Sequence, residues 1–115
     1  MEAAQRAPID VSARRASELL AAGATVVDVR ESYEREAGHI DGTRHIELAR
    51  LTAAAGTIGR ETPVVFYCRV GARSAMAAEA FRASGYDAYS LSGGLLAWVR
   101  EGLPLVPADG RVADH

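Results

Sequence analysis

The residues best suited to chemistry stand in one short stretch, Cys68 to Ser74, which contains the only cysteine of the chain. A cysteine thiolate is a strong nucleophile, and nearby cations and free backbone N–H groups favour it over the thiol. Arg69 and Arg73 supply the cations, and Gly71 lets the backbone curl so that successive amides converge on one point. The stretch therefore predicts a nucleophilic Cys68 in a loop that also attracts anions.

The segments on either side of this loop indicate how it is held. Residues 64–67 are wholly apolar and rich in β-formers, which predicts a strand buried on both faces. From Ser74 the pattern becomes helical, with one side of the predicted helix formed by Met76, Ala77, Ala80, Phe81 and Ser84. Residues 68–73 then form a turn at the carboxyl end of a buried strand, where open α/β sheets bind ligands. The amino end of the helix points free N–H groups into that turn.

The rest of the chain alternates between strand and helix patterns. Further strands are predicted at residues 9–11, 25–29, 45–46 and 86–91, and further helices after Ser12, at 32–37, at 48–55 and after Gly94. Trp98 is expected in the core. This alternation predicts an α/β fold, a three-layer α/β/α sandwich with a mainly parallel sheet, and 115 residues suffice for one domain.

Three ordered motifs resemble those of the rhodanese family of thiosulfate sulfurtransferases. Cys68, Arg69, Gly71, Arg73 and Ser74 match the active-site loop of its single-domain bacterial members. Two flanking matches are Val26–Arg30 followed by Gly38–Gly42, and Leu91–Gly94 followed by Trp98 and Gly102–Pro104. The resemblance implies a rhodanese-like domain with a five-stranded sheet over residues 9–104, between an amino-terminal extension (1–8) and a carboxyl-terminal tail (105–115). The tail is expected to find little to pack against.

The resemblance also implies a reaction. The Cys68 thiolate attacks the outer sulfur of thiosulfate, sulfite departs, and the resulting persulfide passes its sulfur to an acceptor thiol, a protein thiol or cyanide. The outer sulfur would be held by the backbone amides of Val70, Gly71, Ala72 and Arg73. Arg69 and Arg73 would orient the small anionic donor. The alternative role for each arginine is a surface salt bridge. Ser74, Asp28 and Arg30 are assigned to structural support.

Other hypotheses stay open. The domain could relay persulfide sulfur between proteins, or it could be a non-catalytic rhodanese-like binding module. A phosphatase or arsenate reductase is less favoured because such loops read Cys-x5-Arg, whereas the interval from Cys68 to Arg73 is Cys-x4-Arg. A dithiol oxidoreductase is disfavoured because the chain has no second cysteine.

The remaining polar residues suggest structural roles. Asp28 and Arg30 are expected to pair at a strand end, since buried charges are usually paired. His39 is expected to be a hydrogen-bonded loop residue. A metal pair with His45 is disfavoured, because two histidines without helical spacing or acidic or cysteine co-ligands make a poor metal site. No cofactor or metal is expected. A net charge of −2 gives no reason to expect a nucleic-acid or membrane partner, and a cytoplasmic location is expected.

Overall fold

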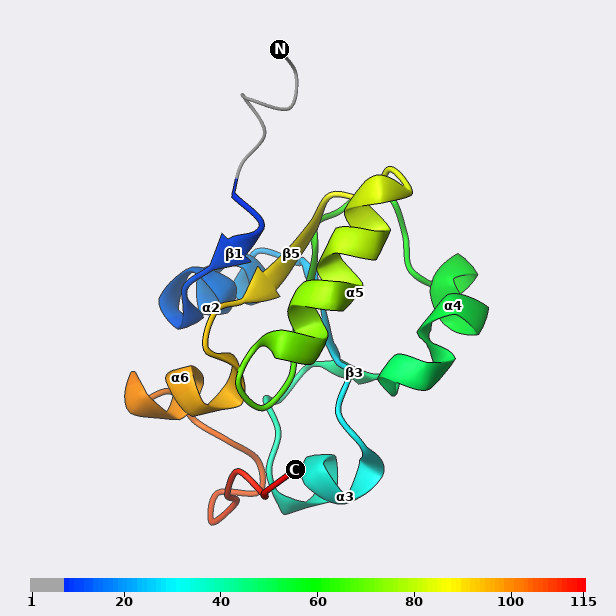
Figure 1. Cartoon of the computed structure of the whole chain (residues 1–115). Coiled ribbons are helices and arrows are strands. Elements are labelled where there is room, and N and C mark those ends of the chain that lie inside the picture. Colours follow the sequence, from blue (N-terminus) through cyan, green and yellow to red (C-terminus); the bar gives the residue numbers. More distant parts are fainter. Residues whose placement is uncertain (1–7) are drawn as a thin grey trace.

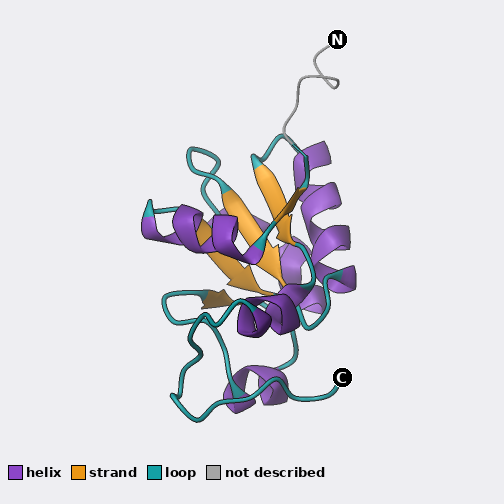
Figure 2. Cartoon of the chain, turned by 90° about the vertical axis from the view of Figure 1, so that its left-hand side faces the viewer, coloured by secondary structure: helices purple, strands orange, loops and turns teal. Residues whose placement is uncertain are grey.

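The computed structural model describes residues 8–115, which form an α/β sandwich around a five-stranded sheet (Figures 1 and 2). The strands are β1 (Asp10–Val11), β2 (Thr25–Asp28), β3 (Arg44–His45), β4 (Val64–Tyr67) and β5 (Ala88–Leu91). All neighbouring strands are parallel, in the order β1-β5-β4-β2-β3. The predicted fold class and the five strands are therefore confirmed.

Helices cover both faces of the sheet. The helical segments are α2 (Ala13–Ala21), α3 (Ser32–Ala37), η1 (Leu48–Arg50), α4 (Leu51–Ala54), η2 (Ala55–Thr57), α5 (Ala72–Ala83) and α6 (Gly94–Arg100). One core cluster joins α4 and α5 to one face, and a second joins α2 and α6 to the other. α3 lies beyond the carboxyl ends of the strands, on the same side as the C-terminus (Figure 1).

The central strand β4 confirms the prediction of a strand buried on both faces. Its four side chains have no exposed area. Val64 and Phe66 face the cluster beneath α5, while Val65 and Tyr67 face the opposite cluster. Because successive side chains of a strand alternate between faces, a strand covered on both sides needs a continuous apolar run.

The buried face of α5 differs from the one that the sequence pattern suggested. Met76 is 63% exposed, and Ala80 and Ser84 are exposed as well, whereas the buried residues are Ser74, Ala77, Ala78 and Phe81. Of the side that the sequence pattern grouped together, only Ala77 and Phe81 are therefore buried. The alanine-rich helix gives almost no apolar asymmetry, so the choice of face rests on fit. Small side chains let α5 lie close to the sheet, and Ser74 turns toward Cys68.

The prediction that residues 105–115 have little to pack against is wrong. Ala113 is only 6% exposed. The backbone of Val106 pairs with that of His39, and the Arg111 N–H donates to the carbonyl of Ala37 at 2.8 Å. These contacts are made by main-chain groups, which a side-chain pattern does not reveal.

The structure tests the predicted domain boundaries only in part. Residues 1–7, most of the predicted amino-terminal extension, lie outside the described residues. A domain boundary after Pro104 stays a prediction, although the segment beyond it is folded against the domain. Across residues 8–115, no helix is both long enough and apolar enough to cross a bilayer.

Candidate active site

The sulfur of Cys68 lies at the carboxyl end of β4, in the turn that leads into α5. The residue is 1% exposed, so its side chain forms the floor of the turn. Its Sγ accepts hydrogen bonds from the N–H groups of Gly71 at 3.1 Å and Ser74 at 3.4 Å. The Ser74 hydroxyl oxygen is 3.5 Å from the same sulfur. The two backbone N–H donors form a cradle around the sulfur atom, and the Ser74 hydroxyl oxygen is an acceptor for the thiol.

The backbone conformation of this turn depends on two glycines. Gly71 has φ +110°, a left-handed conformation that L side chains rarely adopt, and it caps α5. Gly94 has φ +61°, and a Cβ there would lie 2.5 Å from the carbonyl of Arg69. The amino end of α6 therefore fits directly against the turn, where the Leu95 N–H donates to the Cys68 carbonyl at 2.8 Å.

Ser90 is a buried polar neighbour of the site that the sequence analysis did not single out. It lies on β5 with 1% exposure, and its Oγ is 2.8 Å from Oγ of Ser74. Ser74 also donates to the Gly71 carbonyl at 3.2 Å. The contact between the Ser74 and Ser90 hydroxyls fixes the Ser74 side chain. Ser74 was predicted to have a structural supporting role, and it also contacts the sulfur of Cys68. A serine inside an otherwise apolar strand was the available signal.

Arg73 is held by a partner that the sequence analysis missed. Its guanidinium donates to both carboxylate oxygens of Glu34, at 2.9 and 3.0 Å. Glu34 comes from α3 and its side chain has no exposed area. Hydrogen bonding to Glu34 raises the pKa of Arg73 despite partial burial, with smaller contributions from the negative charges of Glu34, of a Cys68 thiolate and of Asp28. The assignment of Arg73 to an anionic substrate stays a prediction.

Arg69 has a different environment. Its side chain is 30% exposed, and one terminal nitrogen is 3.4 Å from a carboxylate oxygen of Asp114. Its Nε is the one buried side-chain nitrogen or oxygen within residues 8–115 that has no hydrogen-bond partner. A buried donor without a partner is costly, so Arg69 retains capacity to bind a further acceptor.

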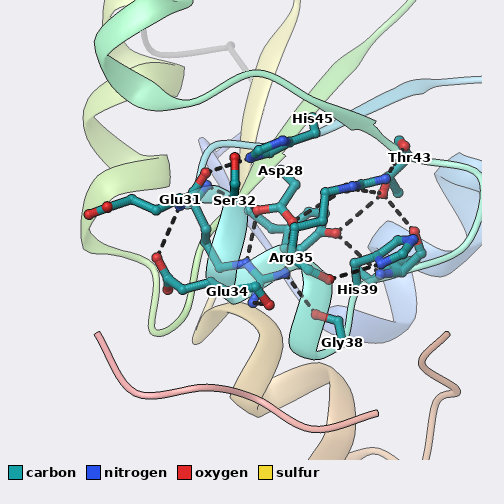
Figure 3. Close-up of polar contacts among 12 residues, drawn as sticks. Asp28, Glu31, Ser32, Glu34, Arg35, Gly38, His39, Thr43 and His45 are labelled. Carbon is teal, nitrogen blue, oxygen red and sulfur yellow. Dashed lines mark hydrogen bonds and ion pairs between the residues drawn. The ribbon is translucent and has the colours of Figure 1, made fainter. Parts of the chain in front are cut away.

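A buried ion pair ties the end of β2 to α3. Arg30 donates to the two carboxylate oxygens of Asp28 at 2.9 and 2.7 Å, and neither side chain is exposed. Arg30 also donates to the carbonyls of Glu34 and Gly38. Arg35 approaches Asp28 at 3.4 Å, and both residues are labelled in Figure 3. The predicted structural pairing of Asp28 with Arg30 is confirmed. The pair also anchors the helix that carries Glu34.

The two histidines flank this network without forming a metal pair. Nδ1 of His39 is 3.1 Å from the Arg35 carbonyl, and Nε2 of His45 is 2.7 Å from the Arg30 carbonyl. His39 is a hydrogen-bonded loop residue, as predicted, and His45 is the last residue of β3. Nearby, Glu31, Glu34 and His115 place oxygen and nitrogen atoms within 4.8 Å of one another. Because Arg73 occupies both oxygens of Glu34, this group is an ion-pair cluster.

Comparison with known proteins agrees with this geometry. Residues 12–101 match the rhodanese-like domain family. The chain belongs to this family. A solved rhodanese-related protein from Thermoplasma volcanium superposes on this rhodanese-like domain with a TM-score of 0.80 and 30% identity, covering 86% of this chain and 98% of that one.

Curated relatives of this rhodanese-like domain include proteins named as sulfurtransferases. A sulfurtransferase of Allochromatium vinosum is 35% identical over 74% of this chain and 80% of its own length. The thiosulfate sulfurtransferase GlpE of Ectopseudomonas mendocina is 34% identical over 87% of this chain and 92% of its own length. The uncharacterized protein YqhL of Bacillus subtilis is 41% identical, but the match spans 60% of that protein. These relatives support a transferase of the rhodanese type.

The Glu34–Arg73 pair gives the rhodanese-like domain an acid-sensitive contact. Burial alone would raise the pKa of Glu34, but hydrogen bonds from Arg73 and from the Glu31 N–H outweigh it, so the pKa lies below the ordinary 4.5. A lowered folded-state pKa stabilises the fold above the unfolded value, and that stability is lost as the pH falls through the folded value.

We therefore expect the free energy of unfolding to decline as the pH falls below about 4.5, and to decline less steeply in Glu34→Gln. Urea unfolding at a series of pH values measures this slope. Glu36→Gln, an exposed position of the same helix, is the matched control. Equal slopes in Glu34→Gln and the wild type would contradict the assignment.

Proposed function

We propose that this rhodanese-like domain is a sulfurtransferase that moves the outer sulfur of thiosulfate, or of another anionic donor, through a persulfide on Cys68. The observation that carries the proposal is the position of Sγ, which is held by the Gly71 and Ser74 amides at the floor of a turn that carries two arginines. The relatives named as sulfurtransferases support it.

The first half-reaction breaks the sulfur–sulfur bond of the donor. The thiolate Sγ attacks the outer sulfur of thiosulfate, and the electron pair of the broken bond leaves with sulfite. The products are a Cys68 persulfide with one negative charge and a sulfite dianion, so the total charge is unchanged. Covalent catalysis of this kind divides one transfer into two easier steps.

The cradle would stabilise both forms of the cysteine. The Gly71 and Ser74 amides lie on Sγ itself. The N–H groups of Ala72 and Arg73 belong to the first turn of α5, where backbone donors have no partner within the helix. Together with the Val70 amide, they would receive the negative outer sulfur of the persulfide. Donors fixed in advance stabilise developing charge without reorganisation.

In the second half-reaction, an acceptor nucleophile attacks the outer sulfur and Sγ leaves as the thiolate. A thiol, including a thiol on another protein, or cyanide can serve, and cyanide would be released as thiocyanate. The reaction needs no cofactor and no metal, since each step is a displacement at sulfur in which the attacking atom supplies the electron pair and the leaving sulfur takes the pair of the broken S–S bond.

The two arginines of the turn would have unequal roles. The charge of Arg73 is largely balanced by Glu34, so this side chain chiefly sets the position of the turn. Arg69 is partly exposed and is engaged by a fully exposed Asp114 at 3.4 Å, so it is the guanidinium better placed to bind the sulfonate oxygens of the donor.

Replacing Arg69 by glutamine is expected to lower kcat/KM for thiosulfate roughly ten- to hundredfold, mainly through a higher KM. A hydrogen bond to a charged group is worth about 1.5–3 kcal/mol, which corresponds to that range. The assay measures thiocyanate formed from thiosulfate and cyanide. Arg100→Gln removes an exposed arginine of α6 and is the matched control. An unchanged dependence on thiosulfate concentration would show that Arg69 does not contact the donor.

A further inference from the structure

We propose that Asp114 sets the charge selectivity of the site, because its carboxylate competes with anionic reagents for Arg69. The proposal rests on the proposed function only in that the natural donor is an anion that binds beside Arg69. Asp114 would weaken the binding of anionic donors relative to that of uncharged ones. It would therefore act as a specificity-determining residue, although it lies 45 residues from Arg69 along the chain.

The backbone of Asp114 is fixed beside the site by the segment that precedes it. The Arg111 N–H donates to the Ala37 carbonyl at 2.8 Å, and Ala113 is buried. The hydroxyl of Tyr33 on α3 donates to the carbonyl of Asp114 at 3.1 Å. The C-terminus lies alongside α3 in both views of the chain (Figures 1 and 2).

Close backbone packing further restricts the path of this segment. A Cβ at Gly38 would lie 2.5 Å from the Arg111 carbonyl oxygen, and one at Gly110 would lie 2.8 Å from the Pro107 carbonyl oxygen. The carboxylate of Asp114 is therefore delivered toward Arg69 by a chain segment that is packed on the domain.

The contact between Asp114 and Arg69 is weak, so a substrate anion can replace Asp114. One carboxylate oxygen of Asp114 lies 3.4 Å from one terminal nitrogen of Arg69, and the Asp114 side chain is fully exposed. The pair leaves Nε of Arg69 without a partner. An incoming anion that binds the exposed part of the Arg69 side chain can displace the carboxylate, whose departure into water costs little.

The expected effect of Asp114 on anion binding is small because its side chain is fully exposed. Pairs between exposed charges change an equilibrium by roughly two- to fivefold at most, and salt screens them. The neutral side chain of Asp114→Asn keeps the backbone carbonyl that accepts from Tyr33, so this variant changes charge with the anchoring intact.

The test compares alkylation of Cys68 by iodoacetate, an anion, with alkylation by iodoacetamide, its neutral analogue. Both form a thioether on Sγ and release iodide, so their rate ratio reports the electrostatic selectivity of the site. We expect Asp114→Asn to raise the iodoacetate-to-iodoacetamide ratio about two- to fivefold at low salt. Asp109→Asn removes an exposed charge from the same segment and is expected to leave the ratio unchanged.

The KM for thiosulfate is measured in parallel, and Asp114→Asn is expected to lower it by a similar factor. A ratio unchanged in Asp114→Asn, or raised equally in Asp109→Asn, would overturn the inference even if thiosulfate turnover is normal. A raised ratio in a protein that does not turn over thiosulfate would instead support the role of Asp114 and count against the proposed function.

Discussion

Cys68→Ser is expected to lower thiosulfate-dependent sulfur transfer by about three orders of magnitude or more, to background, with the fold retained. A serine hydroxyl is far less acidic than a thiol and cannot form a persulfide, so both half-reactions are lost together. The hydroxyl fits the same cradle, because the Gly71 and Ser74 amides that bind Sγ can donate to an oxygen.

The measurement is thiocyanate formation from thiosulfate and cyanide, with circular dichroism and urea unfolding as checks on the fold. Met76→Ala, an exposed substitution one turn along α5, is the control and should keep full turnover. Persistent turnover by Cys68→Ser would rule out a covalent route through this residue.

Asp28→Asn is expected to destabilise the fold by about 3–5 kcal/mol, because it removes the counter-charge of a buried arginine. Arg30 and Asp28 are both fully buried and are joined by three hydrogen bonds, two from the guanidinium at 2.9 and 2.7 Å and one from the Arg30 backbone N–H at 3.0 Å. Since a domain of this size has about 5–15 kcal/mol in total, the variant loses much of its stability.

Equilibrium urea unfolding checks this expectation. Asp10→Asn, an exposed position on the edge strand β1, is the matched control and should change the free energy of unfolding by less than about 0.5 kcal/mol. If Asp28→Asn were as stable as this control, the pair would not be the structural anchor described above.

The central part of the fold could be predicted because its signals are local. A continuous apolar run gave β4, and the switch to helical spacing with Gly71 gave the turn and α5. The pairing of Asp28 with Arg30 was accessible because the two residues are neighbours at a strand end.

The parts that could not be predicted depend on contacts between distant segments. Glu34 and Arg73 are 39 residues apart, and nothing in either motif specifies their pairing. Ser90 reaches the site only because β5 lies beside β4. The buried face of α5 could not be predicted because alanines lie on every side of the helix.

The interval from Cys68 to Arg73 also bears on the rival phosphatase chemistry. The turn brings the Gly71 and Ser74 amides onto the sulfur itself, and Arg73 is engaged by Glu34. A phosphatase loop instead needs its arginine and amides arranged around a tetrahedral oxyanion. This arrangement is the one expected for the proposed sulfur transfer.

The most direct test of the central claim is the intact mass of the purified protein before thiosulfate, after thiosulfate, and after cyanide. The account predicts a gain of one sulfur atom with thiosulfate and its loss with cyanide, accompanied by thiocyanate, with no gain in Cys68→Ser. No gain in the wild type, from a Cys68 that still reacts with iodoacetamide, would contradict the proposed thiosulfate sulfurtransferase. That result would favour a protein persulfide relay or a binding module.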